Sequence, residues 1–198
     1  MHELLTNLTT KIWTTRGCRF IAAKRYEMHD RYSAIVIAAL SVFTIGINLI
    51  PFFYTEYNRS NRIGLCTIIL SMILLSVSQY IYARDYKVKS LRHHACAREL
   101  SNLLDNGELL KERVNLREED IIAISEKYNS LLDQYENHKD IDLNNFYAQN
   151  MEVFISKIGR WPFCFLLKLF WLQFCEIYFG YFILGFVIPI LSVLFIIF

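Results

Sequence analysis

Small polar side chains recur at helical spacing within two long apolar runs of the sequence. The residues that share one helix face in this way are Ser41, Thr44 and Asn48 in the first run and Thr67, Ser71 and Ser78 in the second, with Gln79 adjacent. Hydroxyl groups at such positions can hydrogen-bond across the interface of two closely packed membrane helices. Alternatively, the same face lines a water-filled path once several copies assemble. Asn48 and Gln79 are the most informative positions, because an amide in the middle of a membrane needs a partner or water.

A second polar cluster, Glu136-Asn137-His138-Lys139-Asp140-Ile141-Asp142, lies between two amphipathic stretches. One interpretation is a polar turn whose aspartate caps the following helix. The other is a folding motif or a contact that receives a signal, and its side chains are then Asn137, His138, Asp140 and Asp142. Paired carboxylates can hold a cation, but this spacing lacks the glycine and the terminal Glu of a calcium-binding loop.

Residue types that carry catalysis or bind metals are present but are not arranged for it. His93 and His94 are adjacent, so they point to different faces of a helix, cannot share a metal in the usual i, i+4 way and are expected to be solvated. No nucleophile elbow, HExxH sequence or phosphate-binding glycine loop occurs. We therefore expect no enzyme, no catalytic residue, no metal site and no cofactor.

The cysteines and the charge balance exclude further classes. The five cysteines lack CxxC spacing and are expected to be small buried hydrophobic residues rather than disulfide partners: Cys18, Cys66, Cys96, Cys164 and Cys175. The formal net charge of +2 is too small to indicate nucleic-acid binding by itself, and we predict none.

Membrane helices are the elements that must position the polar faces. Hydrophobic residues make up 54% of the chain and fall in long uninterrupted runs rather than at core-forming intervals, which favours lipid over a soluble core. The runs Tyr32–Tyr54 and Ile63–Ala83 contain no charge. Each exceeds the roughly 20 helical residues that cross a bilayer core. The short connection Thr55–Arg62 makes the two spans an antiparallel hairpin, residues 32–83.

The distribution of basic residues predicts the orientation of this hairpin. Six Lys and Arg residues precede the first span, within residues 1–31, which we interpret as a basic N-terminal helix. The hairpin loop has Arg59 and Arg62, offset by Glu56, whereas a cluster of basic residues follows the second span from Arg84 to Arg98. By the positive-inside rule both ends of the hairpin are cytoplasmic. The N-terminus and residues 84–160 are then cytoplasmic as well.

Residues 84–160 are predicted to be helical throughout. A polar helix continues the second span from Arg84 to Asp105, and Asn106-Gly107 is expected to end it, since Gly supplies the left-handed residue that stops a helix. Further on, apolar residues alternate at spacings of three and four: Ile121, Ile124, Tyr128, Leu131 and Tyr135. This seam predicts packing on another helix, within the protein or between subunits.

The C-terminal segment, residues 161–198, leaves two arrangements open. Ile177–Phe198 is uncharged and long enough to span, whereas Trp161–Cys175 is apolar but contains Lys168 and is followed by Glu176. We interpret Trp161–Cys175 as an interfacial or re-entrant helix followed by a third span, because a charge in mid-membrane costs about 2.5–3.5 kcal/mol. The alternative is a second hairpin with both halves embedded. The expected fold class is an all-α integral membrane protein with an N-terminal transmembrane hairpin, a cytoplasmic helical insert and a hydrophobic C-terminal segment.

This layout resembles a known family. The resemblance rests on the basic helix Arg16–Arg31, the hairpin and the long helix that follows it. That helix contains Ala83-Arg84-Asp85-Tyr86, Leu91-Arg92-His93 and Glu99-Leu100-Ser101-Asn102-Leu103. The chain resembles the SLATT proteins, the SMODS- and SLOG-associating two-transmembrane effector domains of bacteria. The stretch Tyr135–Asp142 is most similar to family five, whose genes sit beside reverse transcriptases. The resemblance implies a membrane effector of an antiphage, abortive-infection defence system. Such subunits are proposed to oligomerise into a pore in the inner membrane when a partner sensor is triggered.

Three hypotheses therefore stand. The first is a pore-forming effector in the bacterial inner membrane, a homo-oligomer whose partners are the lipid bilayer and, by the resemblance, a neighbouring reverse transcriptase or nucleotide-signalling protein. The second is a non-conducting membrane anchor or scaffold for a partner enzyme. The third is a constitutive small channel.

Overall fold

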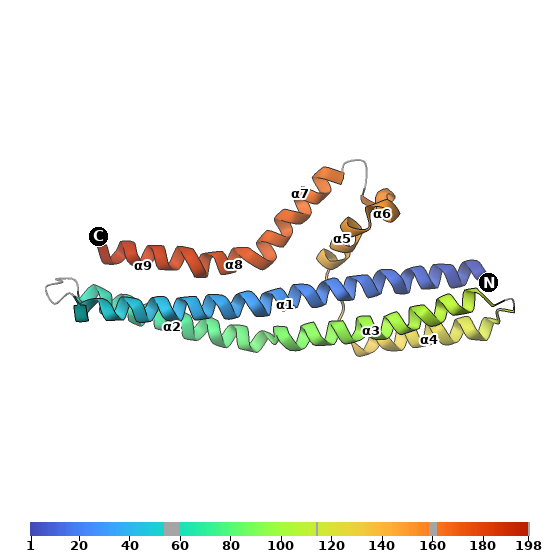
Figure 1. The fold of residues 1–198 in the computed structure, drawn as a ribbon, viewed down its shortest axis with the longest axis horizontal. Coiled ribbons are helices and arrows are strands. Elements are labelled where there is room, and N and C mark those ends of the chain that lie inside the picture. The colour runs from blue at the N-terminus through green and yellow to red at the C-terminus, as the bar shows by residue number, and fades with distance from the viewer. Residues whose placement is uncertain (54–59, 114, 159–161, 198) are drawn as a thin grey trace. The chain divides into compact units, whose positions relative to one another are not determined.

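Helices are the only regular elements in the residues that the structure, a computed structural model, describes: 1–53, 60–113, 115–158 and 162–197. In chain order they are α1 (His2–Phe53), α2 (Ser60–Arg84), α3 (Tyr86–Lys111), α4 (Glu118–Gln134), α5 (Asp140–Gln149), α6 (Met151–Ile158), α7 (Pro162–Gln173), α8 (Phe179–Phe182) and α9 (Ile188–Ile197), as labelled in Figure 1. π-helical segments at Phe174–Tyr178 and Ile183–Val187 flank α8. The predicted all-α class is confirmed. Most of the predicted hairpin loop, and Trp161 at the predicted start of the C-terminal segment, lie outside the described residues.

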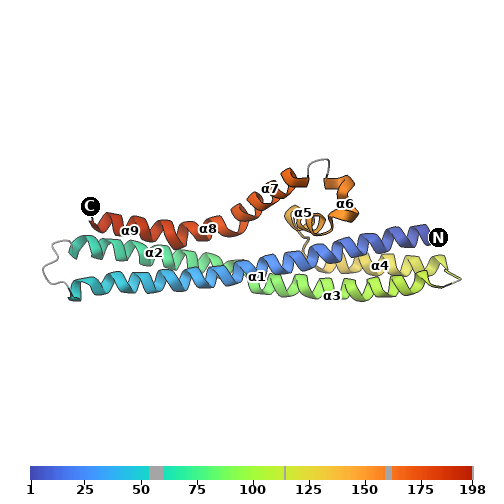
Figure 2. The same cartoon turned by 45° about the horizontal axis from the view of Figure 1, so that its top comes forward.

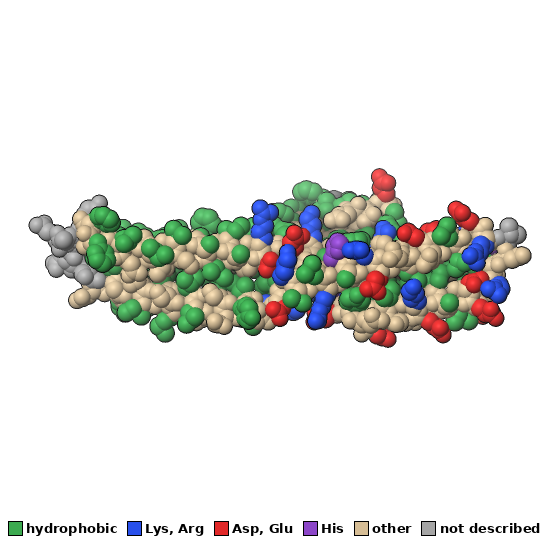
Figure 3. Space-filling model, turned by 60° about the horizontal axis from the view of Figure 1, so that its bottom comes forward, with side chains coloured by type: hydrophobic (Ala, Val, Ile, Leu, Met, Phe, Trp, Pro, Cys, Tyr) green, Lys and Arg blue, Asp and Glu red, His purple; other side chains and the backbone are tan. Residues whose placement is uncertain are grey.

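The chain divides into two compact units. The polar unit comprises Met1–Glu27 and Lys87–Leu172, and the apolar unit comprises Met28–Tyr86 and Gln173–Phe198. In the space-filling view, charged side chains gather over the polar unit and hydrophobic ones cover the apolar unit (Figure 3). Each unit has its own core, so each can be described by itself.

Three helices of the polar unit pack side by side around one core: the first part of α1, α3 and α4 (Figures 1 and 2). Fully or almost fully buried residues from all three helices form this core: Leu5, Ile12, Cys96, Leu100, Leu103, Ile121, Ile124, Tyr128 and Leu131. The seam predicted on α4 therefore packs within the chain, with Tyr135 partly buried at its end.

Gly107 does not end the polar helix as the sequence predicts. Helix α3 passes through Gly107 and ends at Lys111. The residue is buried, and a Cβ atom there would lie only 2.8 Å from Cγ2 of Thr9 on α1. The glycine serves the close approach of two helices rather than a left-handed turn. A left-handed residue does occur at Asp85, φ 50°, where α2 ends and α3 begins, so the polar helix does not simply continue the second span.

Helices α5 and α6 pack on another side of α1 through an aromatic cluster. Cys18, Phe146 and Phe154 are its buried members, and the ring of Trp13 lies 4.9 Å from that of Phe146, edge to face. The Phe146 ring occupies the space where a side chain of Gly17 would stand, since a Cβ atom there would be 1.9 Å from its Cε2. The missing side chain is therefore what lets α5 approach α1.

The apolar unit contains residues 28–53 of α1, α2 and the C-terminal helix from Gln173 onward. Its small core consists of Ile47, Ile63, Cys66, Leu70 and Ile196, and α2 packs against α9. Three helices of the described chain are long and apolar enough to cross a membrane, namely those at His2–Phe53, Asn61–Lys111 and Pro162–Ile197. Much of their apolar surface is exposed; Val42, for example, is 70% exposed and Met72 65%. An apolar surface of this extent supports association with a membrane.

The C-terminal helix is continuous from Pro162 to Ile197. Lys168 is exposed on it, and Glu176 lies in the first π-helical segment. The interfacial placement of residues 161–175 stays a prediction.

Candidate functional site

The polar face predicted in the two spans bonds mainly to its own helices. The hydroxyls of Ser41, Thr44, Ser71 and Ser78 donate to the backbone carbonyl four residues earlier at 2.7–2.8 Å. Thr67 donates to the Gly64 carbonyl at 2.9 Å. Serine and threonine satisfy themselves in this way inside a helix. These hydroxyls therefore need no partner on another helix.

The two amides behave differently from the hydroxyls. Thr44 and Thr67 are buried, whereas Asn48, Ser71 and Gln79 are exposed. The Asn48 amide donates to the Thr44 carbonyl at 3.1 Å. The Gln79 side chain makes no hydrogen bond to any residue that the structure describes. Both amides of the predicted set are therefore exposed, and Gln79 is the one that lacks a hydrogen bond among the described residues.

A histidine and a tyrosine far apart in the sequence meet in the apolar unit. His29 Nδ1 lies 3.2 Å from the Tyr181 hydroxyl, which also donates to the His29 carbonyl at 3.2 Å, and the Tyr86 ring stacks on His29 at 5.0 Å. A cavity of about 420 Å³ adjoins them, with Glu176 in its wall. Sequence reasoning missed this cluster. Its one signal is the abundance of tyrosines near the ends of the apolar runs, which does not reveal that residues 152 positions apart are in contact.

In the polar unit, the turn centred on residue 139 forms a buried ion pair. Asp142 is 0% exposed, and its two carboxylate oxygens accept hydrogen bonds from Arg25 Nε at 2.8 Å and from Arg25 Nη2 at 2.9 Å. Asp142 also accepts from the backbone N–H of Lys139 at 3.0 Å, at the start of α5. The same carboxylate thereby caps α5 and ties it to α1, and the Asp142 partner raises the pKa of Arg25 against the opposing effect of burial.

A second arginine, Arg19, is fully buried and forms no ion pair with any carboxylate that the structure describes. Its Nη1 lies 3.4 Å from His93 Nδ1, and its Nη2 donates to Asn137 Oδ1 at 3.4 Å. Arg19 Nε has no partner among the described residues. The cluster therefore holds two guanidinium groups against one carboxylate. Such an arrangement is costly, because buried charges need compensation.

His93 departs from the predicted solvated position. It is 3% exposed, and its ring stacks on Tyr26 with centroids 5.4 Å apart. Burial, and then the charge of Arg19, lower the pKa of His93 to about 4. The ring is therefore neutral at pH 7, and its Nδ1 can accept from Arg19. His94 is exposed on another face of α3, as its adjacent position requires.

The other members of the turn are less enclosed. Asp140 is exposed at the first position of α5, and Asn137 is exposed apart from its contact with Arg19. His138 is half-buried, and its Nδ1 is buried without a hydrogen-bond partner among the described residues. Burial, and then the charge of Arg19, lower the pKa of His138. The structure thus brings Asn137, His138 and Asp142 around Arg19 and leaves Asp140 outside.

Within the described residues, no group of three or more His, Cys, Asp or Glu side chains could hold a metal ion. Comparison with known proteins gives one match. The model of the SMODS and SLOG-associating 2TM effector domain family 5 matches residues 1–198. No curated protein and no solved structure matches the chain. The family description counts two transmembrane segments, whereas the described part of the chain has three helices of sufficient length and apolarity.

Proposed function

Since the chain belongs to the SMODS and SLOG-associating 2TM effector domain family 5, whose members are associated with defence systems, we propose that it is the membrane effector of a bacterial antiphage system. Triggered by a partner sensor, its subunits assemble in the inner membrane and breach it, and the infected cell stops growing or dies. The sensor is a neighbouring reverse transcriptase or a nucleotide-signalling protein. The chain itself carries out no chemical step and needs no cofactor.

One observation carries the assembly step: the outward-facing amides of Asn48 and Gln79. A single copy in lipid would expose both groups to hydrocarbon, where polar groups without partners are costly. A second copy, or water in a path between copies, relieves this cost. Ser71 is exposed as well.

The basic residues that flank the hairpin set the orientation of the effector. With the N-terminus and residues 84–160 in the cytoplasm, the polar unit meets the sensor, and the apolar unit is the part that crosses the bilayer. The exposed apolar side chains of the apolar unit support this division.

Membrane potential in infected bacteria that express the chain beside its genomic neighbours tests the proposal. We expect depolarisation that depends on those neighbours and is lost in Asn48→Leu. The matched variant Asn48→Gln keeps an amide and should retain depolarisation. Both variants must be present in the membrane fraction at wild-type amounts.

An intact membrane during infection, with the wild-type protein present, would overturn the pore and leave the non-conducting anchor in its place. Depolarisation without any neighbour gene would instead favour a constitutive channel. Equal activity of Asn48→Leu and the wild type would show that the outward amide does not line or assemble the pore.

A further inference from the structure

The polar unit contains a cavity whose lining includes neither Arg25 nor Asp142 of the buried ion pair. It lies between the first part of α1 and the segment from His138 to Lys157, and its volume is about 340 Å³. Ligand-binding sites commonly range from about 300 to 1,000 Å³. Thr10, Lys11 and Thr14 stand at helical spacing on the α1 wall, and His138, Phe154 and Lys157 stand opposite. The space therefore suits a small organic molecule better than a single ion.

The charges that line this cavity are all of one sign. Lys11 and Lys157 belong to its wall, and none of the described residues that line it is Asp or Glu. The ammonium group of Lys11 lies 5.2 Å from the Tyr128 ring centroid, and that of Lys157 lies 5.5 Å from the centroids of Tyr147 and Phe154. Aromatic faces hold a lysine without neutralising it. Neither lysine forms an ion pair with any residue that the structure describes.

The residues behind the cavity wall add to this positive field. Arg19 is buried next to Cys18 of the wall in the sequence, and the only carboxylate next to a wall residue in the sequence, Asp142, is paired with Arg25. His138 Nδ1 is buried without a hydrogen-bond partner among the described residues. A cavity with walls of one sign attracts ligands of the opposite sign.

We propose that this cavity binds a small organic phosphate, or another oxyanion of similar size, between Lys11 and Lys157. Ammonium groups are strong donors to phosphate oxygens. The hydroxyls of Thr10 and Thr14 now donate to their own helix at 2.8 and 2.9 Å and remain acceptors or can rotate to donate. Phe154 supplies an apolar surface for the organic part. The binding step does not depend on pore formation, so the two can fail separately.

The phosphate can belong to a soluble ester or to a lipid headgroup, and one experiment separates the two sources. The full-length chain is placed in phosphatidylcholine nanodiscs, and binding of inorganic pyrophosphate is measured by calorimetry. In a second arm, native mass spectrometry counts phosphatidic acid retained by the chain in mixed detergent micelles. Saturable binding in the first arm identifies a soluble anion, and selective retention in the second arm alone identifies a lipid.

Two lysine substitutions make the test specific. Lys11→Gln combined with Lys157→Gln should weaken binding at least tenfold, whereas Lys127→Gln, which removes an exposed lysine of α4 outside the cavity, should leave it unchanged. If the double variant does not fold, Lys157→Glu alone places a negative charge at the exposed end of the cavity and should abolish binding. Absence of binding in both arms, or equal weakening by Lys127→Gln, would overturn the proposal.

Discussion

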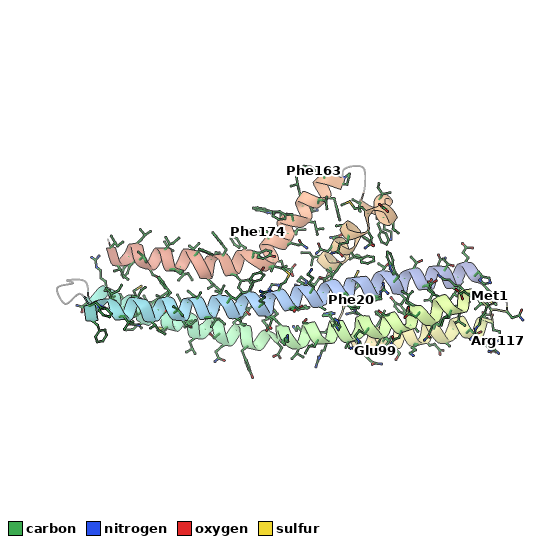
Figure 4. All side chains as sticks on the ribbon, in the orientation of Figure 1. Met1, Phe20, Glu99, Arg117, Phe163 and Phe174 are labelled. Atoms are coloured by element: carbon green, nitrogen blue, oxygen red, sulfur yellow. The ribbon has the colours of Figure 1, made fainter. Side chains whose placement is uncertain are left out.

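Several buried polar side chains of the polar unit link elements that are far apart in the sequence, whereas the serines and threonines of the hairpin in the apolar unit donate within single helices. Arg25 and Asp142 are 117 residues apart, and the Thr15 and Tyr128 hydroxyls, 113 residues apart, lie 2.9 Å from each other. The Tyr135 hydroxyl donates to Glu99, labelled in Figure 4, at 2.7 Å. The serines and threonines of the hairpin instead donate to carbonyls three or four residues earlier.

This difference determines how far the helices of each unit can move relative to one another. Buried polar links work only in one arrangement, because a displaced charge is left without its partner. Helices that meet through apolar surface and self-satisfied hydroxyls have no such restriction and can repack against another copy. His29 and Tyr181 are the clearest cross-link in the apolar unit. The polar contacts of the polar unit thus favour one arrangement of its helices, and those of the hairpin place fewer constraints on how its helices pack.

Buried cysteines give each unit its own readout for testing this comparison. Cys18 and Cys96 are buried in the polar unit, and Cys66 is buried in the apolar unit. A thiol reagent reaches each of them only when its surroundings open, so labelling followed by mass spectrometry reports the free energy of local opening. Cys164 and Cys175 are exposed, so the burial expected for them from the sequence is wrong, and they serve as labelling controls.

The largest effect is expected for Asp142→Asn. The substitution leaves the Arg25 guanidinium buried without a carboxylate, and breaking a buried pair in this way costs about 3–5 kcal/mol. Cys18 and Cys96 should become accessible at lower denaturant concentration, while Cys66 is unchanged. The control Asp140→Asn alters an exposed carboxylate of the same turn and should stay within about 0.5 kcal/mol of the wild type. If Cys66 also became accessible at a lower denaturant concentration, by the same amount, the two units would open together.

Glycines on one helix provide the next test. Gly17→Ala in the polar unit forces a Cβ atom into the Phe146 ring and should lower the free energy of unfolding by about 3 kcal/mol, the upper end of the usual cost of overpacking. Gly46→Ala in the apolar unit meets no atom within 4 Å. It should leave stability unchanged or raise it by up to about 1 kcal/mol, because alanine favours the helix. The measurement is protection of Cys18 and Cys66 from the thiol reagent. A similar loss at both positions would contradict the comparison.

The sequence predicts features that rest on local pattern. Uncharged runs mark the helices that can cross a membrane, and the spacing of Ile121, Ile124, Tyr128 and Leu131 marks the buried face of α4. These predictions succeed because length and periodicity are properties of a single helix. The sequence does not predict that Asn48 and Gln79 are exposed, because the same spacing of polar residues is compatible with a face that is buried or exposed.

Features that depend on which helices meet are not predictable in this way. Asp142 is recognisable as a capping residue, but nothing near it in the sequence names Arg25 as its partner. The sequence Asn106-Gly107 is typical of the end of a helix, but Gly107 lies inside α3, where it is close to Thr9 of α1. Nothing in the sequence around His93 and His94 predicts which of the two is buried. In each case the deciding partner comes from another element.

Acid is expected to weaken the polar unit through His93. Its pKa falls from 6.5 to about 4 on folding. Below pH 6.5 the unfolded chain therefore binds a proton that the folded chain does not, and the free energy of unfolding falls as the pH is lowered towards 4. Between pH 7 and pH 5 the loss should be about 1–2 kcal/mol. His138 contributes with the same sign, because its pKa is lowered as well.

The variant His93→Gln tests this origin of the pH dependence. Glutamine keeps an acceptor for Arg19 but does not titrate, so the loss of stability on acidification should become smaller. Thermal unfolding of the full chain, followed by circular dichroism at pH 5 and pH 7, gives the comparison. The exposed His94→Gln is the matched control and should retain the wild-type slope. An unchanged slope in His93→Gln would exclude His93 as the group that titrates.

The smallest effect is expected from removing single hydroxyl groups. The comparison is between a hydroxyl that bonds to another helix and one that bonds to the backbone of its own helix. Tyr128→Phe removes the contact with Thr15, and a single buried hydrogen bond contributes about 1 kcal/mol. Ser71→Ala removes only a bond to the Thr67 carbonyl, which still accepts from its own helix, so stability should change by no more than a few tenths of a kcal/mol. Opening at Cys96 and at Cys66 measures the two effects separately. If Ser71→Ala proves as costly as Tyr128→Phe, the hydroxyls of the hairpin hold its helices together after all, and the apolar unit is less free to repack than its contacts indicate.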